Sequence, residues 1–459
     1  MVDLSEVIVL GGPAAVAAGG LALRAYAPGA YWTALGYPAA TVRVLGTWPT
    51  VTDSCGLAVR PSRVRSAVAK VRGRQAGHRP PRRGVLSPTR CGFTVALRLR
   101  PGQTPSDYEA ACERLRHAWG VHAVYARPGR PGRVVLRAVA WDVLRKPKIP
   151  PRVRRGLLAV PVGVFEDGTT YLRDFRAVPH RMTMGATQSG KSTHIRALIN
   201  ELAPQPVALV GVDCKRGIEL APFAPRFTAL ATNPDEADDL LTALEVELDA
   251  RLDRLAAHPG AVDIYHLPEA ARPVPVVVFV DEVAELFMTV SKNDTDRRDR
   301  AVHTLVRIGQ LGRAAGLYLE VCGQRFGSEL GKGATMLRAQ LTGRVCHRVN
   351  DQATAEMALA DIAPEAVEAA TRLSPDRPGL AVVGSDAGTW QRARTPFTSL
   401  NHAADQVAAY AHLAPAWSQL PRPVTTPLAR HEPPQPTTPG APTPTVPPQR
   451  GPGREDTPA

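Results

Sequence analysis

The chain has 459 residues, enough for two or three domains, and a formal net charge of +14. Its six cysteines form no C-x-x-C pair and its twelve histidines show no H-E-x-x-H spacing. These patterns argue against a disulfide framework and a zinc site, and they indicate reduced, mostly buried thiols in a cytoplasmic protein.

The first fifty residues contain two runs without charged side chains. These runs cover residues 7–23 and 25–42. Each is near the lower length limit for a helix that spans a bilayer, and both are rich in Gly, Ala and Pro. If they span, the arginine-rich segment that follows stays on the cytoplasmic side. The sequence leaves two alternatives for residues 1–50: a membrane-associated segment, or a soluble helical extension.

A basic block lies between Arg43 and Arg155. It holds about 25 Lys and Arg against about 5 Asp and Glu, so the rest of the chain is mildly acidic. Such a block favours phosphate, in nucleic acid or in anionic lipid. The alternative is a solvated, arginine-rich surface. Within the block, residues 51–90 are rich in Arg, Pro and Gly, and we predict that they form a linker.

Residues 91–150 are predicted to form a small αβ domain. Residues 92–100 (GFTVALRLR) alternate like a strand, and residues 105–120 have helical spacing with Ser106 as the expected N-cap. Residues 121–140 suggest two strands around a Gly/Pro turn, which is a hairpin.

Residues 151–400 contain a nucleotide-binding motif. The sequence GATQSGKST fits G-x-x-x-x-G-K-[ST], with an apolar run before it and a helical pattern after it, as the motif requires. Backbone N–H groups and a helix N-terminus would surround the phosphates. Lys191 would reach the β- and γ-phosphates, and Ser192 would bind Mg²⁺. The predicted ATP-binding residues are Gly185, Ala186, Thr187, Gln188, Ser189, Gly190, Lys191, Ser192 and Thr193.

A second motif, VPVVVFVDEVAEL, covers residues 274–286. Its run from Val276 to Val280 is apolar on both faces, which suits a central parallel strand. We predict that Asp281 holds Mg²⁺ through water and that Glu282 orients and polarises the attacking water. The carboxylate pair indicates hydrolysis, and ATP is favoured because the sequence has no N-K-x-D guanine-reading motif.

Further strands and helices alternate around this loop. The other predicted strands cover 207–213, 316–324, 343–349 and 379–384, and the predicted helices cover 235–258 and 297–316. Such alternation predicts an α/β core with a parallel sheet. Residues 401–459, rich in proline from about Pro421, are predicted to be a disordered C-terminal tail that could bind a partner.

Over about residues 91–400, these segments together resemble the FtsK/SpoIIIE family of DNA-translocating ATPases. The similarity is carried by four segments: PHRMTMGATQSGKST (179–193), GVDCKRGIEL (211–220), GRAAGLYLEVCGQRF (312–326) and LTGRVCHRV (341–349). The resemblance implies a P-loop, RecA-like ATPase core after a small αβ domain. The chain departs from the family where Cys214 replaces a proline, where GQRF replaces Thr-Gln-Arg-Pro, and where no winged-helix-like module follows residue 400.

The resemblance also implies roles for single residues. Gln324 would be the polar sensor at the γ-phosphate. Arg344, with Arg313 as the second choice, would be an arginine finger that reaches a neighbouring subunit's ATP. Asp213 and Lys215 would couple nucleotide to substrate. A finger acting in trans implies a ring, and the family implies a hexamer around duplex DNA.

The function implied by the resemblance is ATP-dependent translocation of double-stranded DNA, in plasmid conjugative transfer or chromosome segregation. The composition and short N-terminus resemble the plasmid-transfer branch of actinomycetes. Two alternatives stay open: a protein-secretion ATPase of the same superfamily, and a nucleotide-binding regulator or scaffold without motor activity. The single phosphate loop counts against the first, and the intact Lys191 and Glu282 count against the second.

Overall fold

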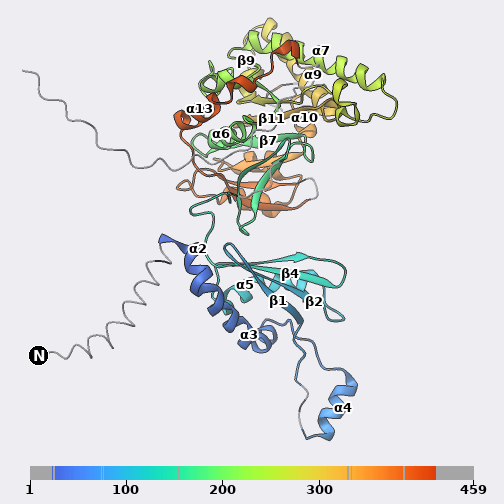
Figure 1. Cartoon of the computed structure of the whole chain (residues 1–459), viewed down its shortest axis with the longest axis vertical. Coiled ribbons are helices and arrows are strands. Elements are labelled where there is room, and N and C mark those ends of the chain that lie inside the picture. The colour runs from blue at the N-terminus through green and yellow to red at the C-terminus, as the bar shows by residue number, and fades with distance from the viewer. Residues whose placement is uncertain are drawn as a thin grey trace, which may run out of the picture. The chain divides into compact units, whose positions relative to one another are not determined.

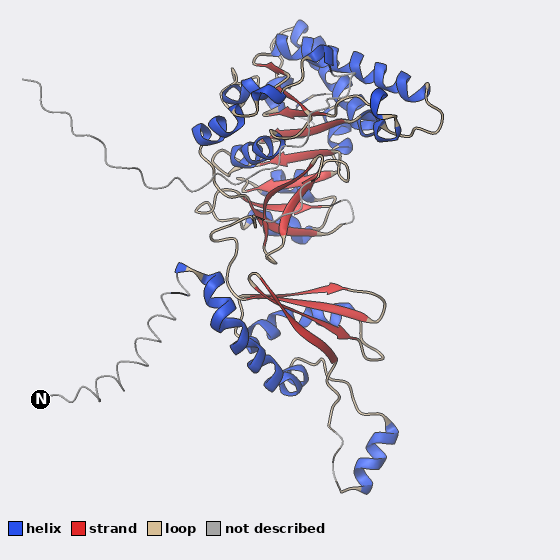
Figure 2. Ribbon diagram, in the orientation of Figure 1, coloured by secondary structure: helices blue, strands red, loops and turns tan. Residues whose placement is uncertain are grey.

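The structure is a computed structural model that describes residues 23, 26–73, 75, 77–151, 156–327, 330–331, 333–385 and 388–419. Most of the first uncharged run and the proline-rich tail from residue 420 lie outside the described residues. The described chain contains a four-stranded sheet and a ten-stranded sheet, each covered by helices (Figures 1 and 2).

The four-stranded sheet is antiparallel, in the order β1-β2-β4-β3. Its strands are β1 (Arg82–Thr89), β2 (Gly92–Arg98), β3 (Ala123–Pro128) and β4 (Arg133–Val139). The predicted hairpin is therefore present as β3 and β4. Helix α5 (Pro105–Trp119) buries Tyr108, Leu115 and Trp119 in the same core. Its N-cap is Thr104 rather than Ser106, because the Thr104 amide donates to Asp107 Oδ2 at 2.7 Å.

This small domain starts earlier in the chain than residue 91. Helix α3 (Tyr37–Ser54) buries Val44 and Trp48 in the core, and the Trp48 ring stacks on Trp119 at 6.2 Å between ring centroids. Strand β1 lies inside residues 51–90, the segment that was expected to be a linker, and it pairs with β2. Residues 51–90 are therefore not all linker. Among the described residues, no helix combines the length and the apolar character that a bilayer crossing requires.

Three short helices complete this region. They are α2 (Pro28–Tyr31), the π-helical turn η1 (Trp32–Gly36) and α4 (Arg63–Val71). The Trp32 indole of η1 donates to the carbonyl of Gly92 at 2.9 Å, which fixes this turn to the start of β2.

The ten-stranded sheet has the order β6-β5-β14-β13-β12-β7-β11-β10-β8-β9. Neighbours from β12 to β9 are parallel, and neighbours from β6 to β12 are antiparallel. The predicted α/β core with a parallel sheet is present in the half from β12 to β9. The strands are β5 (Ala159–Phe165), β6 (Thr170–Asp174), β7 (His180–Met184), β8 (Ala208–Val212), β9 (Ala229–Ala231), β10 (Val276–Val280), β11 (Leu317–Gly323), β12 (Gly343–His347), β13 (Leu380–Gly384) and β14 (Trp390–Arg394).

Helices cover both faces of this sheet because its central strands are apolar on both sides. Along β10, Val276, Val278 and Val280 join one buried cluster, whereas Val277 and Phe279 join the other. The first cluster includes residues of α7 (Pro234–Ala256), α9 (Lys292–Ala315), α10 (Ala334–Gln340), α11 (Gln352–Leu359) and α12 (Pro364–Thr371). The second includes residues of α6 (Lys191–Leu202), η2 (Ala221–Arg226) and α13 (Leu400–Ala408).

The core extends past residue 400, where the sequence analysis placed the start of the tail. Ala403 and Val407 of α13 are buried in the second cluster, and η6 (Ala411–Leu413) follows with Leu413 buried. The remaining short elements are η3 (Ile264–His266), η4 (Glu269–Ala271), α8 (Val283–Phe287) and η7 (Trp417–Gln419).

Candidate nucleotide-binding site

The predicted phosphate loop lies at the carboxyl edge of the parallel strands. It joins β7 in the middle of the sheet to α6, whose first residue is Lys191. Strand β10 ends at the same edge with Asp281 and Glu282, and β11 ends there with Gln324. The open ends of parallel strands are the usual ligand position in such sheets.

Backbone contacts hold the phosphate loop in place. The Gly185 amide donates to the carbonyl of Gly323, and the Ala186 amide donates to the carbonyl of Arg348, at 3.2 and 2.9 Å. The Gly379 amide donates to the carbonyl of Ser189 at 2.9 Å. Gly190 needs its left-handed φ of +104°, and a Cβ there would lie 2.0 Å from the Gly379 nitrogen. The loop therefore depends on both neighbouring strands and on the segment before β13.

Lys191 is held by the acidic end of β10. Its Nζ donates to the carbonyl of Asp281 and to Glu282 Oε2, each at 3.2 Å. The residue is only 9% exposed. Lys191, which is expected to bind phosphate, is thus paired with Glu282, which is expected to polarise the attacking water.

Glu282 has partners at both carboxylate oxygens. Oε1 accepts the backbone N–H of Gln324 at 3.1 Å, and Oε2 also lies 3.3 Å from Lys215 Nζ. The structure therefore places Lys191, Lys215 and the Gln324 backbone around Glu282, and the Gln324 side chain makes no part of this contact. Two lysines thus contact Oε2 of Glu282, and the Gln324 backbone holds Oε1.

Asp281 is buried beside this pair. Its Oδ1 has no hydrogen-bond partner among the described residues, and the same holds for Ser189 Oγ in the loop. Burial raises the pKa of Asp281 to about 6; nearby Lys191 lowers it and nearby Asp213 raises it. A buried carboxylate oxygen without a partner suits a cation, and oxygen ligands are those that Mg²⁺ prefers. The residues present therefore fit a bound Mg²⁺ next to nucleotide phosphates.

Asp213 shapes the loop that carries Lys215. Its Oδ2 accepts the amides of Glu219 and Leu220 at 2.9 and 3.0 Å, and its Oδ1 accepts the Lys215 amide at 3.2 Å. The side chain is fully buried. Asp213 thus acts on the loop backbone, and Lys215 is the member of this pair that reaches the site.

The two candidate arginine fingers lie elsewhere. Arg344 on β12 is 5% exposed and donates to the carbonyl of Arg338 and to Asp361 Oδ2, at 3.2 and 3.4 Å. Arg313, near the end of α9, lines a hollow with Tyr265 and Tyr318 at the amino end of β11, opposite the phosphate loop. Within the described chain, neither arginine lies beside Lys191.

A group of residues that follows β12 also lies near the phosphate loop and was not predicted from the sequence. A nucleotide hollow of about 350 Å³ is lined by Ala186, Glu282, Glu285, Gln324, Arg325, Asn350 and Asp351, among others. Arg348, nearby, donates to the carbonyl of Thr187 in the phosphate loop at 3.3 Å. No motif marks these residues, and the only signal was their position just after a buried strand at the carboxyl edge.

Comparison with protein families gives two matches along the chain. Residues 17–140 match the actinomycete conjugal transfer protein N-terminal domain, and residues 143–266 and 261–328 match the FtsK/SpoIIIE family. Transfer protein TraSA of Streptomyces ambofaciens is 49% identical over 402 residues, covering 83% of this chain and 97% of that protein. The chain belongs to the FtsK/SpoIIIE family. Its match along nearly all of TraSA places it in the plasmid-transfer branch.

A more distant relative and a solved structure are also similar to the chain. DNA translocase FtsK of Streptomyces avermitilis is 31% identical over 224 residues, covering 44% of this chain and 24% of that protein. The solved structure of the pCW3 conjugation coupling protein TcpA, in monomer form with ATPγS, has 18% identity and a TM-score of 0.51. It covers 77% of this chain and 95% of that one, and it supports the fold assignment. The family match and the site geometry identify the core as an ATPase.

Proposed function

We propose that this FtsK/SpoIIIE member is an ATP-driven translocase of double-stranded DNA in plasmid conjugative transfer, acting as a hexameric ring with its motor in the cytoplasm. The relatives support this proposal by name: one is a transfer protein, several are DNA translocases, and the structural neighbour is a conjugation coupling protein. The basic balance of the chain supports an anionic polymer as the cargo, bound through its phosphates without regard to sequence.

The contact between Lys191 and Glu282 carries the enzymatic part of the proposal. Without nucleotide, Lys191 Nζ lies 3.2 Å from Glu282 Oε2. An ATP γ-phosphate would draw Lys191 away, because phosphate carries more negative charge than one carboxylate. Glu282 would keep the Gln324 amide on one oxygen and turn the other towards water. Nucleotide binding would thereby release the base that hydrolysis needs.

Mg²⁺ would be held by Asp281 and Ser192 together with the phosphates. Among the described residues, no group of three or more His, Cys, Asp or Glu could hold a metal without the nucleotide. When bound, the ion would neutralise charge on the β- and γ-phosphates. Asp281 would contribute its oxygen Oδ1, which has no other partner within the described chain.

An arginine from a neighbouring subunit would complete each site in the ring. For Arg344 to act in this way, it must exchange Asp361 for the neighbour's phosphates, because its side chain is now buried beside Asp361. We therefore propose that ring assembly moves Arg344, and we expect Arg344→Ala to lower hydrolysis only under conditions where rings form.

The test is ATP hydrolysis by the full chain, with and without linear duplex DNA, beside Glu282→Gln. We expect duplex of any sequence to stimulate hydrolysis about 10-fold or more. Glu282→Gln should lower the stimulated rate roughly 10²–10⁴-fold, the usual contribution of a general base. It should still bind ATP, because the amide keeps the shape of the site.

A second variant, Glu285→Gln, is the matched control, because it removes a carboxylate from the same hollow without contacting Lys191. Its rate should stay within about threefold of the unmodified chain. Equal rates with and without DNA, together with unaffected hydrolysis in Glu282→Gln, would contradict the proposal. Such a result would favour a regulator or a pump for another polymer.

A further inference from the structure

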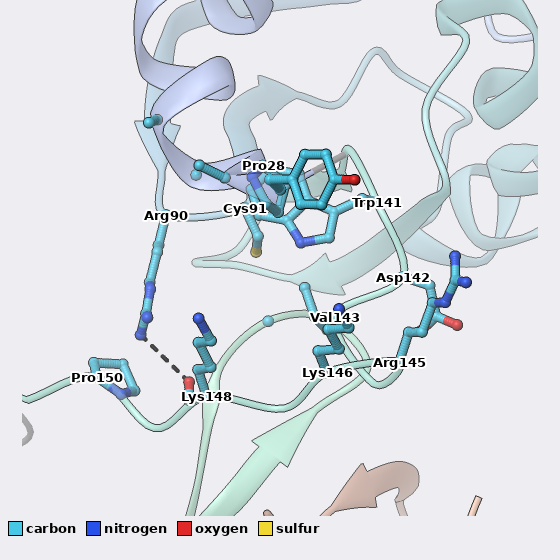
Figure 3. Close-up of a pocket in the computed structure, with 15 residues that line it drawn as sticks. Pro28, Arg90, Cys91, Trp141, Asp142, Val143, Arg145, Lys146, Lys148 and Pro150 are labelled. Atoms are coloured by element: carbon cyan, nitrogen blue, oxygen red, sulfur yellow. Dashed lines mark hydrogen bonds between the residues drawn. The ribbon is translucent and has the colours of Figure 1, made fainter. Parts of the chain in front are cut away.

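Another cavity is lined mainly by residues of the small domain and of the segment that follows it. It has a volume of about 760 Å³, and residues from 26–30, 90–91 and 141–150 together with Gly168 line it (Figure 3). We name it the basic hollow, because Arg90, Arg145, Lys146 and Lys148 line it against a single acid, Asp142. Neither the family matches nor the nucleotide chemistry assigns it a role.

The positive charge of the basic hollow is not neutralised from within. Asp142 forms an ion pair with Arg377 at 2.8 Å, so its negative charge is already balanced by a residue outside the lining of the hollow. The four cations form no ion pair with an acidic side chain in the described part of the chain. Figure 3 shows the charged ends of Arg90 and Lys148 close together, and Arg90 donates to the carbonyl of Lys148 at 3.4 Å. Adjacent cations of this kind attract a phosphate group.

Part of the lining of the basic hollow is apolar and aromatic. Trp141, Val143 and Pro28 form part of the lining, and the Trp141 ring packs edge-on against Trp32 at 6.4 Å between centroids. Backbone anchors make this a shaped site: Arg394 donates to the carbonyls of Leu144 and Arg145 at 2.8 and 3.1 Å. A ligand that fits must therefore carry a phosphate at one end and an apolar portion at the other.

The size of the basic hollow favours the phosphate of a lipid headgroup over the phosphates of duplex DNA. Duplex DNA is a wide convex cylinder, and its backbone cannot enter a concavity that matches a small-molecule site. A glycerophosphate headgroup fits, and the first carbons of its acyl chains would lie on Trp141 and Pro28. Tryptophan and tyrosine are also the residues that favour the headgroup level of a bilayer, and Tyr26 stands at the rim.

The position in the chain favours the same ligand. Residues 26–30 line the basic hollow, and only Arg24 and Ala25 separate them from the uncharged run of residues 7–23. We propose that the basic hollow binds the headgroup of an anionic phospholipid, with its phosphate at Arg90, Lys146 and Lys148 and its glycerol at Trp141. This site would fix the small domain at an anionic membrane surface, and it does not depend on what the motor translocates.

The test is binding of the full chain to vesicles, by flotation, with the triple variant Arg90→Gln, Lys146→Gln and Lys148→Gln. The vesicles contain phosphatidylcholine alone or with about a third phosphatidylglycerol. Each basic residue at an anionic surface contributes about 1 kcal/mol, which is roughly fivefold, so three give a preference on the order of 100-fold. We expect the triple variant to lose most of this preference for anionic vesicles.

A matched triple variant controls for net charge. Arg98→Gln, Arg130→Gln and Arg133→Gln remove the same charge from exposed positions of the same small domain. It should keep the preference to within about threefold. If both triple variants lose it equally, the attraction is general surface charge and the proposed site is wrong.

Soluble probes distinguish the source of the phosphate. Dihexanoyl phosphatidylglycerol below its micelle concentration should bind the full chain one to one, and Trp141→Ala and the hollow triple variant should each weaken it about tenfold or more. Inorganic phosphate should bind far more weakly. Equal binding of inorganic phosphate, or a duplex oligonucleotide that binds through these same three residues, would overturn the lipid assignment. DNA-stimulated ATP hydrolysis in solution should be unchanged in the hollow variant, which keeps this result separate from the motor proposal.

Discussion

The two halves of the ten-stranded sheet differ in what they contribute to the site. In the parallel half, β7, β10 and β11 end at one edge and place Lys191 and the Gln324 backbone within hydrogen-bonding distance of Glu282. The antiparallel half, from β13 to β6, supplies backbone to that edge. Its Gly379 amide supports the phosphate loop, and Arg377 pairs with Asp142 after the small domain. The candidate catalytic residues therefore lie in the parallel half. The antiparallel half contacts both the phosphate loop and the segment that follows the small domain.

The largest effect on stability is expected where a buried ion pair joins the two halves. Arg173 on β6 lies 3.2 Å from Glu320 on β11, and both side chains are fully buried. Glu320→Ala leaves Arg173 without its partner and Thr183 without its acceptor. We expect the free energy of unfolding to fall by about 3–5 kcal/mol. Chemical denaturation measures this change.

An exposed ion pair is the matched control. Glu368 pairs with Arg372 at the surface of α12, with both side chains more than half exposed. Glu368→Ala should change the free energy of unfolding by less than about 1 kcal/mol. Similar losses for the two variants would show that the pair at Glu320 does not join the halves.

Gly190→Ala should break the contact between the phosphate loop and the antiparallel half. The added Cβ would lie 2.0 Å from the Gly379 nitrogen, and alanine is strained at φ +104°. Strain and collision together should cost roughly 2–3 kcal/mol and weaken ATP binding about 10-fold or more. Gly260→Ala is the control, because Gly260 also has a positive φ but nothing lies within 4 Å of the added atom. If the two variants bind ATP equally, the Gly379 contact has no role in the site.

Stability of the parallel half should fall in acid. Burial lowers the pKa of His180 to about 3 and that of His347 to about 4, and burial with nearby His347 lowers the pKa of His194 well below its usual value. In the unfolded chain these histidines bind protons below about pH 6.5, whereas in the folded chain they remain neutral. Their stabilisation is therefore complete above pH 6.5 and is lost as pH falls towards 4.

At pH 5.5 the three buried histidines together should lower the free energy of unfolding by on the order of 3–4 kcal/mol. Asp281 opposes it weakly, because its raised pKa of about 6 lets the folded chain hold one proton in the same window. Denaturation midpoints measured from pH 7.5 to 5 give the slope of stability against pH and test this prediction. His347→Asn should make it shallower, whereas substitution of the exposed His402 should not. A stability that is flat over this range would contradict neutral burial of these rings.

The smallest effect is expected where the antiparallel half meets the segment after the small domain. Arg377→Gln removes the pair with Asp142 at 2.8 Å, a half-exposed contact that contributes less than about 1 kcal/mol to stability. Because Arg377 lies two residues before Gly379, we expect KM for ATP to rise about two- to threefold while kcat stays constant. Asp142→Asn should give the same result, and the double variant should add nothing. If the KM changes of the two single variants added up in the double variant, a direct interaction between Arg377 and Asp142 would be contradicted.

Strands β7 and β10 of the parallel half were predictable because a functional motif directly follows each apolar run. The run from Val276 to Val280 is apolar on both faces, and a functional pair follows it directly. Among the antiparallel strands, β13 (LAVVG) was predicted from its apolar run, whereas β5, β6 and β14 were not. Strand β5 is apolar but contains Pro161 and Gly163, which are unfavourable inside a strand, and β14 (WQRAR) is mostly polar and half-exposed.

The start of the small domain was hidden for a related reason. Strand β1 buries only Leu86 among eight residues, as expected of an edge strand, so its sequence has no alternating pattern and matches a basic linker. In the site, Lys191 and Glu282 followed from motifs. Arg348 and Asn350 could not, because their places depend on how β12 lies beside β7 in three dimensions.

The central claim is that ATP hydrolysis at Lys191 and Glu282 moves the protein along duplex DNA. The most direct measurement is displacement of a triplex-forming oligonucleotide from a linear duplex by the full chain, with ATP and with Glu282→Gln as the control. We predict ATP-dependent release whose delay grows with the distance between the DNA end and the triplex, and no release by the variant. Hydrolysis without release at any distance would contradict translocation and would leave an ATPase that binds DNA without moving along it.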